Sequence, residues 1–327
     1  MGFRSPVMER LLIGVDIGGT NVRMGVVTPE GRVLEKVEYL TDTSRGGLAL
    51  FQELISHLKD LIRKDFKPSH TLIGIGIGVA GIIDIKKGIL RYSPNLPDLN
   101  GVELRDFLKE KISAPIVIEN DANAFTLGEG WMGAARGSQH YCGITLGTGV
   151  GGGMVVEGKI LHGTEGMAGE VGHMVINPEG LLCSCGGKGC LEVYASGTGI
   201  RRMALEAIEK GKGKGILQWS GGNPQKITSE KVFEAAQSGD LTAKEIFVRM
   251  GGYLGLGLVD LIHLFNPEKI VIGGKVSRAW DYFIGNTMET VQERSMKGPR
   301  ERVQIVQALC GDDAGILGAA YSVLIES

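Results

Sequence analysis

The stretch Asp16-Ile17-Gly18-Gly19-Thr20-Asn21-Val22 returns in related form later in the chain, as Gly147-Thr148-Gly149-Val150. With Gly19 set over Gly147, the segment Gly25-Val26-Val27 also lies over Gly153-Met154-Val155. Both copies read as a strand, a Gly-Thr turn, a strand, a glycine turn and a third strand. Such self-similarity indicates an internal duplication. The sequence therefore predicts two related lobes that face each other across a cleft, with one Gly-Thr turn on each wall.

Strand-like and helical segments alternate along the whole chain, which is the pattern of an α/β protein. We expect a smaller lobe over residues 1–119, rejoined by a C-terminal helix over 312–327, and a larger lobe over 120–311. The expected strands cover residues 11–17, 22–28, 32–40, 72–79, 82–85, 89–92, 116–119, 141–146, 152–156, 159–161, 269–272 and 303–306, and the main expected helices cover 46–64, 122–132 and 244–264.

Glycine is unusually frequent, at 52 of 327 residues, which is about 16% against an average of roughly 7%. No Gly-X-Y period occurs, so collagen is excluded, and the hydrophobic content of 43% is ample for two domain cores. The 35 basic and 37 acidic residues nearly cancel, which argues against nucleic acid or an anionic membrane as a partner. No secretory or membrane-spanning segment is expected, so we expect a cytoplasmic protein.

Gly-Thr turns at strand ends expose backbone N–H groups that can bind phosphate oxygens. One such turn is equally a plain hairpin, whereas two related turns favour a site that holds one polyphosphate. The chain lacks a GxxxxGK[ST] motif, and its two GxGxxG matches, Gly76/Gly78/Gly81 and Gly147/Gly149/Gly152, run into further strands instead of opening a helix. A Rossmann-type dehydrogenase is therefore the weaker alternative.

Asp16 ends the first expected strand, beside the first Gly-Thr turn. A carboxylate at this place repels phosphate unless a divalent cation lies between them, which indicates Mg²⁺ held directly or through water. An aspartate that accepts hydrogen bonds from the turn explains the same residue, and the two interpretations are compatible.

Asp121, in the segment Glu119-Asn120-Asp121-Ala122, stands between an expected strand and a helix of small residues. An aspartate at a helix start most simply caps the helix. The same position also directs its carboxylate into the expected cleft, where it would orient an acceptor hydroxyl and take its proton, as an aspartate does in protein kinases. Taken alone, the residue is better explained as a cap; the two Gly-Thr turns make the catalytic interpretation competitive.

Three cysteines lie close together in Cys183-Ser184-Cys185-Gly186-Gly187-Lys188-Gly189-Cys190, shortly after His173. Three thiolates and one imidazole form the closed tetrahedral ligand set that suits structural Zn²⁺. Disulfide pairing is the alternative, but Cys183 and Cys185 are too near in sequence to pair comfortably and a third thiol would be left over. The pattern favours zinc.

Taken together, these motifs resemble the ROK family (repressor, open reading frame, kinase), and within it the bacterial glucokinases. The resemblance covers nearly the whole chain and also includes Gly169-Glu170-Val171-Gly172-His173 and the run from Cys183 to Glu192. It implies a duplicated actin-like, ribonuclease H-like ATPase fold with two lobes around an active-site cleft. The implied activity is ATP-dependent phosphorylation of a hexose 6-hydroxyl, most simply that of glucose.

The same resemblance assigns roles residue by residue. It implies that Asp121 is the catalytic base and that His173 binds sugar as well as zinc. The implied sugar-binding residues are Asn95, Asn120, Asp121, Glu170, His173 and Glu192; the implied residues around ATP and Mg²⁺ are Asp16, Gly18, Gly19, Thr20, Asn21, Thr148, Gly149, Gly273 and Gly274; the zinc ligands are His173, Cys183, Cys185 and Cys190.

Two other functional classes are alternatives to a sugar kinase. Some ROK members are sugar-responsive repressors with a helix-turn-helix before the first phosphate turn; here the first strand is expected from Leu11, and the charge is not basic. A sugar-sensing protein without catalysis is the second class, and Asp121 and the two Gly-Thr turns argue against it. Kinases for N-acetylglucosamine, N-acetylmannosamine, mannose or fructose are the alternatives to a glucose kinase, and we expect a homo-oligomer.

Overall fold

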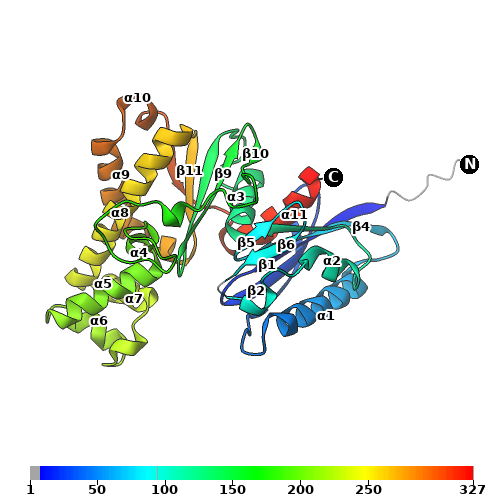
Figure 1. Cartoon of the computed structure of the whole chain (residues 1–327), viewed down its shortest axis with the longest axis horizontal. Helices are drawn as coiled ribbons and strands as arrows, with labels where there is room; N and C mark the ends of the chain where they lie inside the picture. The colour runs from blue at the N-terminus through cyan, green and yellow to red at the C-terminus, as the bar shows by residue number, and fades with distance from the viewer. Residues whose placement is uncertain (1–7, 94, 327) are drawn as a thin grey trace, which may run out of the picture. The chain divides into compact units, whose positions relative to one another are not determined.

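The computed structural model describes residues 8–93 and 95–326 and divides into two compact units (Figure 1). The first unit comprises Met1–Gly137, Lys159–Gly169 and Leu309–Ser327, and the second comprises Ser138–Gly158 and Glu170–Ala308. The expected lobe boundary at residues 119 and 120 falls ahead of α3 (Asp121–Trp131). In the structure α3 groups with the first unit, because it packs along the C-terminal helix α11 (Ala314–Glu326).

A five-stranded sheet in the order β3-β2-β1-β4-β7 forms the centre of the first unit. The first three strands are antiparallel, and β4 and β7 join β1 in parallel. A short separate hairpin pairs β5 with β6. The elements are β1 (Glu9–Ile17), β2 (Asn21–Val27), β3 (Val33–Leu40), α1 (Gly47–Asp65), β4 (His70–Val79), β5 (Ile82–Asp84), β6 (Ile89–Tyr92), α2 (Leu104–Lys109), β7 (Ile116–Asn120), α3 and α11.

The second sheet repeats this plan in the order β10-β9-β8-β11-β12. Its β8 and β9 are antiparallel, whereas β8, β11 and β12 run in parallel. The elements are β8 (Tyr141–Leu146), β9 (Val150–Val156), β10 (Lys159–Ile160), α4 (Glu192–Ala195), α5 (Gly197–Glu209), α6 (Lys214–Trp219), α7 (Ser229–Gln237), α8 (Leu241–Phe265), β11 (Lys269–Gly273), α9 (Trp280–Arg294), α10 (Lys297–Arg300) and β12 (Gln304–Gln307). The matching strand order confirms the duplicated α/β fold.

Glycines let α11 lie directly on the first sheet and on α3 (Figure 1). A Cβ added to Gly76 of β4 would stand 1.7 Å from the carbonyl oxygen of Ala319, and one added to Gly318 would stand 1.6 Å from that of Ala124. Backbones that approach so closely leave no room for a side chain. Gly76 of the first GxGxxG match therefore packs a strand against a helix and does not belong to a dinucleotide loop.

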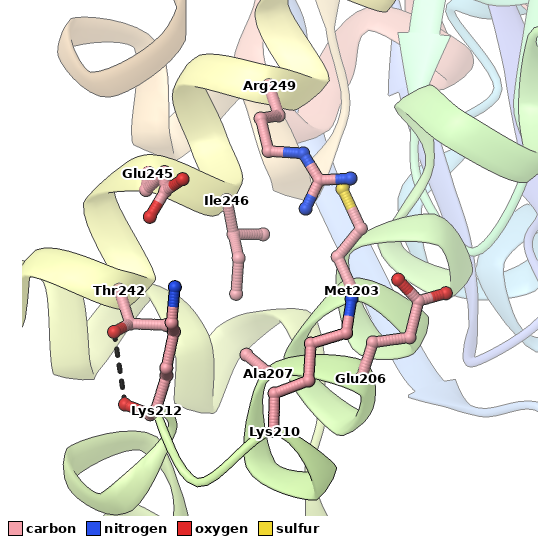
Figure 2. Close-up of a pocket in the computed structure, with 9 residues that line it drawn as sticks. All are labelled: Met203, Glu206, Ala207, Lys210, Lys212, Thr242, Glu245, Ile246 and Arg249. Carbon is pink, nitrogen blue, oxygen red and sulfur yellow. Dashed lines mark hydrogen bonds between the residues drawn. The ribbon is translucent and has the colours of Figure 1, made fainter.

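Helices α5 and α8 of the second unit lie side by side and line a pocket of about 210 Å³ (Figure 2). Its floor is apolar, with Met203, Ala207 and Ile246, and charged side chains stand around its rim. None of the residues assigned to substrate or cofactor lines this pocket.

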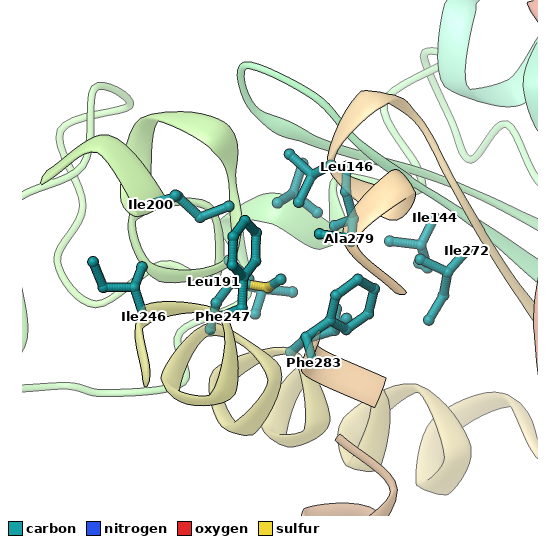
Figure 3. Packing of buried hydrophobic residues seen from close by; sticks show 14 of the residues in the cluster. Ile144, Leu146, Leu191, Ile200, Ile246, Phe247, Ile272, Ala279 and Phe283 are labelled. Carbon is teal, nitrogen blue, oxygen red and sulfur yellow. The ribbon is translucent and has the colours of Figure 1, made fainter. Parts of the chain in front are cut away.

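Apolar side chains from the sheet and the helices form the core of the second unit (Figure 3). Phe247 of α8 and Phe283 of α9 are buried in it, in the same cluster as Ile144 of β8 and Ile272 of β11. Within the described residues, α8 is the one helix long and apolar enough to cross a membrane, but 61% of its apolar window is buried inside the protein. That burial is typical of the core helix of a globular protein.

Candidate active site

The first Gly-Thr turn connects β1 to β2 and is fixed by the end of β3. The Gly18 N–H donates to the Asn21 carbonyl at 3.0 Å, and the Thr41 N–H donates to the Thr20 carbonyl at 2.8 Å. The Thr41 hydroxyl adds a bond of 2.7 Å to the Gly18 carbonyl. Gly19 and Thr20 are exposed at the tip. The turn is thus rigidly held while its tip is accessible, as a phosphate-binding turn requires.

Asp16 lies at the end of β1, beneath this turn, and its titration is strongly perturbed. Burial raises the pKa of its carboxyl from 3.8 to about 7, and the charges of Asp121 and Asp312 act in the same direction. The nearby Arg23 guanidinium lowers that pKa without reversing the shift. Space is tight, since a Cβ on Gly315 would stand 2.6 Å from Asp16 Cγ. A buried carboxylate beside two further carboxylates forms a site whose charge a divalent cation would neutralise.

Asn120, and not Asp121, caps α3. The helix begins at Asp121, one residue earlier than expected, and the Asn120 side-chain oxygen accepts the N–H groups of Ala122 and Asn123 at 2.9 and 3.0 Å. The Asn120 amide also donates to the Gly81 carbonyl at 3.0 Å. The capping role considered for Asp121 is therefore filled by Asn120.

Asn95, which the family resemblance assigned to the sugar, lies near the first turn. A Cβ on Gly19 would stand 3.7 Å from Asn95 Nδ2. Asn95 also lines a small pocket together with Gly18, Thr41 and Ala80. The first unit therefore gathers Asp16, the turn and Asn95 at one end of its sheet.

A contact between Glu119 and His162, which no sequence pattern predicted, lies at the end of β7 in the same sheet. Glu119 of β7 is 1% exposed, and its Oε2 is 2.7 Å from Nε2 of His162. In the sequence, the position of Glu119 beside Asn120 and Asp121 was the one indication that Glu119 belongs to the site. No local pattern marks His162, because the contact joins residues far apart in the chain.

The second Gly-Thr turn, between β8 and β9, is held by the start of α5. The Gly147 N–H donates to the Gly149 carbonyl at 3.0 Å, and the Thr198 hydroxyl donates to the Thr148 carbonyl at 2.8 Å. The second GxGxxG match therefore forms a hairpin turn, which excludes the dinucleotide-binding arrangement. Gly274 has a φ of +85° and lies against this turn, where a Cβ would stand 2.5 Å from the Leu146 carbonyl oxygen.

Glu192 meets the same turn from the other side, through a bond of 3.0 Å from the Val150 N–H to its Oε2. Glu170 is close enough to Glu192 and His173 for their charges to act on it. Burial raises the pKa of the Glu170 carboxyl, the His173 charge lowers it, and the Glu192 charge raises it. Glu170 Oε2 lies 4.0 Å from His173 Nε2. The second unit thus brings together three of the residues assigned to sugar.

The four expected zinc ligands converge in the second unit, with their donor atoms all within 4.8 Å of one another. Cys183 Sγ is 3.7 Å from His173 Nδ1, and Cys185 Sγ is 3.7 Å from Cys190 Sγ. Bonds of about 2.3 Å to a tetrahedral zinc place neighbouring sulfur atoms about 3.8 Å apart, so the spacing fits this ion. It is too long for a disulfide, whose S–S bond is about 2.05 Å.

The loop reaches this geometry through its glycines. Gly186 and Gly189 have φ values of +89° and +73°, and a Cβ on Gly189 would stand 1.6 Å from the Asn177 carbonyl oxygen. The Cys183 N–H donates to the Gly187 carbonyl at 2.7 Å, which closes the turn that carries Cys183 and Cys185. The backbone is therefore preformed for a compact ligand set.

The fold and these turns define a protein with the duplicated actin-like architecture of sugar kinases. The chain belongs to the ROK family, whose model matches residues 12–325. It is 40% identical to a glucokinase of Thermotoga maritima, over 94% of this chain and 96% of that protein. It is 37% identical to a glucokinase of Halalkalibacterium halodurans, over 96% and 95% of the two chains.

A solved structure of a ROK family glucokinase from Streptomyces griseus, in complex with glucose and AMPPNP, is also similar. It superposes with a TM-score of 0.83, is 34% identical, and the match covers 95% of this chain and 98% of that one. This similarity confirms the two-lobed sugar-kinase fold that the sequence predicted.

Proposed function

We propose that this protein transfers the γ-phosphoryl group of ATP to the 6-hydroxyl of glucose. The family, the glucokinases to which the chain is 37–40% identical, and the similar glucokinase structure with glucose and AMPPNP support this activity. The structural observation that carries it is the placement of Asp121 at the start of α3 with the capping role taken by Asn120.

Asp121 is proposed as the general base. It takes the proton of the sugar hydroxyl while that oxygen attacks the γ-phosphorus, and the bond from the γ-phosphorus to the bridging oxygen breaks as ADP leaves. General-base catalysis contributes about 10²- to 10⁴-fold, so Asp121→Asn should lower kcat by that order and change the KM for sugar little. Asp281→Asn, in the first turn of α9, is the matched control and should keep wild-type kcat. Near-normal turnover of Asp121→Asn would refute the assignment.

The phosphates are proposed to lie on the two Gly-Thr turns. Gly18, Gly19, Thr20 and Asn21 would contribute from the first turn, and Thr148 and Gly149 from the second, with Gly273 and Gly274 beside the adenosine. Mg²⁺, which when bound neutralises phosphate charge, is assigned to the carboxylate of Asp16. The raised pKa of Asp16 supports this choice, because a carboxylate that is costly to ionise alone gains most from a cation.

Six polar residues are proposed to bind the sugar. Asn95, Asn120 and Asp121 come from the first unit, and Glu170, His173 and Glu192 come from the second. Of the two Asn120 amide hydrogens, one donates to Gly81, and the second is the one proposed for a sugar hydroxyl. Sites built from many such groups reject analogues that lack a hydroxyl.

Structural Zn²⁺ is proposed on His173, Cys183, Cys185 and Cys190, whose donor spacing supports it. It would fix the loop that carries His173, and the Glu170 carboxylate near the other ring nitrogen would orient that imidazole. In this arrangement one histidine serves the metal and the sugar pocket together.

An ATP-coupled assay over glucose, mannose, fructose, N-acetylglucosamine and N-acetylmannosamine tests the activity. We expect the highest kcat/KM with glucose. A higher value with another hexose would reassign the substrate, and no phosphorylation of any sugar, with sugar binding retained, would favour the non-catalytic sugar-sensing alternative.

We further propose that the enzyme works in the cytoplasm as a homo-oligomer, with sugar and ATP as its partners and neither nucleic acid nor membrane among them. The near balance of 35 basic and 37 acidic residues supports the second part of this proposal.

A further inference from the structure

Glu119 is buried, and both oxygens of its carboxylate have hydrogen-bond partners. Its Oε1 accepts the Asn120 N–H at 2.8 Å and the Asn123 side-chain amide at 3.0 Å. Its Oε2 meets Nε2 of His162 at 2.7 Å. Through Asn120 and Asn123, Glu119 therefore fixes the turn on which Asp121 stands.

The charge of Glu119 requires a partner, because an ionised carboxylate out of water is stable only when paired and hydrogen-bonded. Asn120 and Asn123 are neutral, so of these three partners only His162 can neutralise the Glu119 carboxylate. The Glu119 hydrogen bond raises the pKa of the His162 imidazole, burial opposes this shift, and the Glu326 charge supports it. Glu326 of α11 in turn faces Arg105 of α2. The two carboxylates therefore stabilise the charged form of the His162 imidazole.

His162 belongs to the segment Lys159–Gly169, which is counted with the first unit. The Ala168 N–H donates to the His162 carbonyl at 3.1 Å, which closes the segment into a loop. Gly166 lies against β5, where a Cβ would stand 1.9 Å from the Ile83 carbonyl oxygen. The next residue after the segment is Glu170, the first residue assigned to sugar in the second unit.

We propose that His162, as an imidazolium, is a positioning residue for phosphoryl transfer: it neutralises Glu119 and thereby fixes the Asn120–Asp121 turn that presents the base. This inference rests on the proposed function. His162 does not touch the reacting atoms in this assignment. It acts through Glu119. It also holds the segment Lys159–Gly169, which leads to Glu170, at the end of β7.

His162→Gln tests the charge, because glutamine can still donate one hydrogen bond but cannot neutralise the carboxylate. A small displacement of a catalytic group costs up to about 100-fold in rate, so kcat should fall by between 10- and 100-fold, with a smaller change in the KM for sugar. Combining it with Glu119→Gln removes the uncompensated charge and should restore part of kcat. A coupling of this kind between the two substitutions is measured by a double-mutant cycle.

The pH profile separates positioning from a merely structural contact. Deprotonation of His162 should give the wild-type kcat an alkaline limb, and the double variant should lack that limb. His57→Gln is the matched control, because His57 of α1 has no assigned role in the site: it pairs with Glu53 at 3.9 Å and stacks on the Tyr39 ring. Its kcat and pH profile should equal those of the wild type.

Titration of the histidine side chains by NMR gives a readout that needs no activity. We expect His162 to titrate above the ordinary value of about 6.5 in the wild type, and closer to that value in Glu119→Gln. If the proposed function is wrong, no hexose will be phosphorylated. The titration still tests the interaction between Glu119 and His162 in that case. The inference is overturned if His162 titrates at or below its ordinary value, or if the folded double variant keeps the wild-type kcat and alkaline limb.

Discussion

Replacing Asp16 by asparagine should make the protein more stable at neutral pH and less active. The carboxyl pKa is about 7 in the folded protein and 3.8 in its ordinary environment, so the folded state favours the protonated acid. Below pH 3.8 the group is protonated in both states and costs nothing. As the pH rises from 3.8 through 7, the unfolded state loses this proton first, and the wild-type stability falls.

The size of the effect follows from the shift of the pKa. A difference of about three pH units at 1.36 kcal/mol per unit gives about 4 kcal/mol as an upper value. Asp16 is half-buried, and water that reaches the carboxylate reduces the measured effect below this value. Asparagine has nearly the same shape without the charge. The advantage of Asp16→Asn over the wild type should therefore be small at pH 4 and grow towards pH 8.

Urea unfolding of both proteins at several pH values between 4 and 8 measures this difference. Asp84→Asn is a control of opposite sign. Burial raises the pKa of Asp84, but the hydrogen bond from Arg91 lowers it and the net shift is downward. Loss of this carboxylate should therefore destabilise the protein at neutral pH. A stability difference between Asp16→Asn and the wild type that stays constant from pH 4 to pH 8 would refute the reasoning. Added Mg²⁺ should stabilise the wild type more than the variant.

Two further substitutions test the zinc loop and the glycine packing. Cys185→Ser should abolish the one zinc per chain expected from elemental analysis and lower the Tm, and an active wild-type protein free of metal would contradict the site. Gly318→Ala should destabilise by about 1–3 kcal/mol, because its Cβ would stand 1.6 Å from a carbonyl oxygen. Gly285→Ala, in a helix and open to solvent, should instead stabilise by up to about 1 kcal/mol. Equal Tm values for the two alanine variants would contradict the packing argument.

Local sequence patterns predicted the strands of both sheets well. The strand expected over 141–146 is β8 itself, and most other boundaries moved by one or two residues. β9 begins at Val150, two residues earlier than expected, because pairing with β8 continues up to the turn. The duplication was visible because each copy keeps its turn glycines, which the backbone needs whatever surrounds them.

Contacts between distant segments were beyond the reach of such patterns. The zinc ligands lie within one loop, so their spacing alone indicated the site. His162 and Glu119 come together only because the chain returns to the first unit after β9. The same holds for the carboxylates around Asp16, since Asp312 reaches this region from the other end of the chain. A short stretch of sequence around either residue gives no indication of such a contact.

The choice between a capping and a catalytic Asp121 shows how the structure separates two uses of neighbouring residues. Asparagine and aspartate are equally good caps by propensity, so propensity does not explain why Asn120 fills this place. An aspartate there would lack the N–H that Asn120 donates to the Gly81 carbonyl. It would also add a carboxylate beside Glu119 and Asp121, next to an Asp16 whose pKa is already raised. A neutral cap therefore holds the turn without adding charge, and it leaves the negative charge of the turn on Asp121, the residue to which we assign the proton transfer.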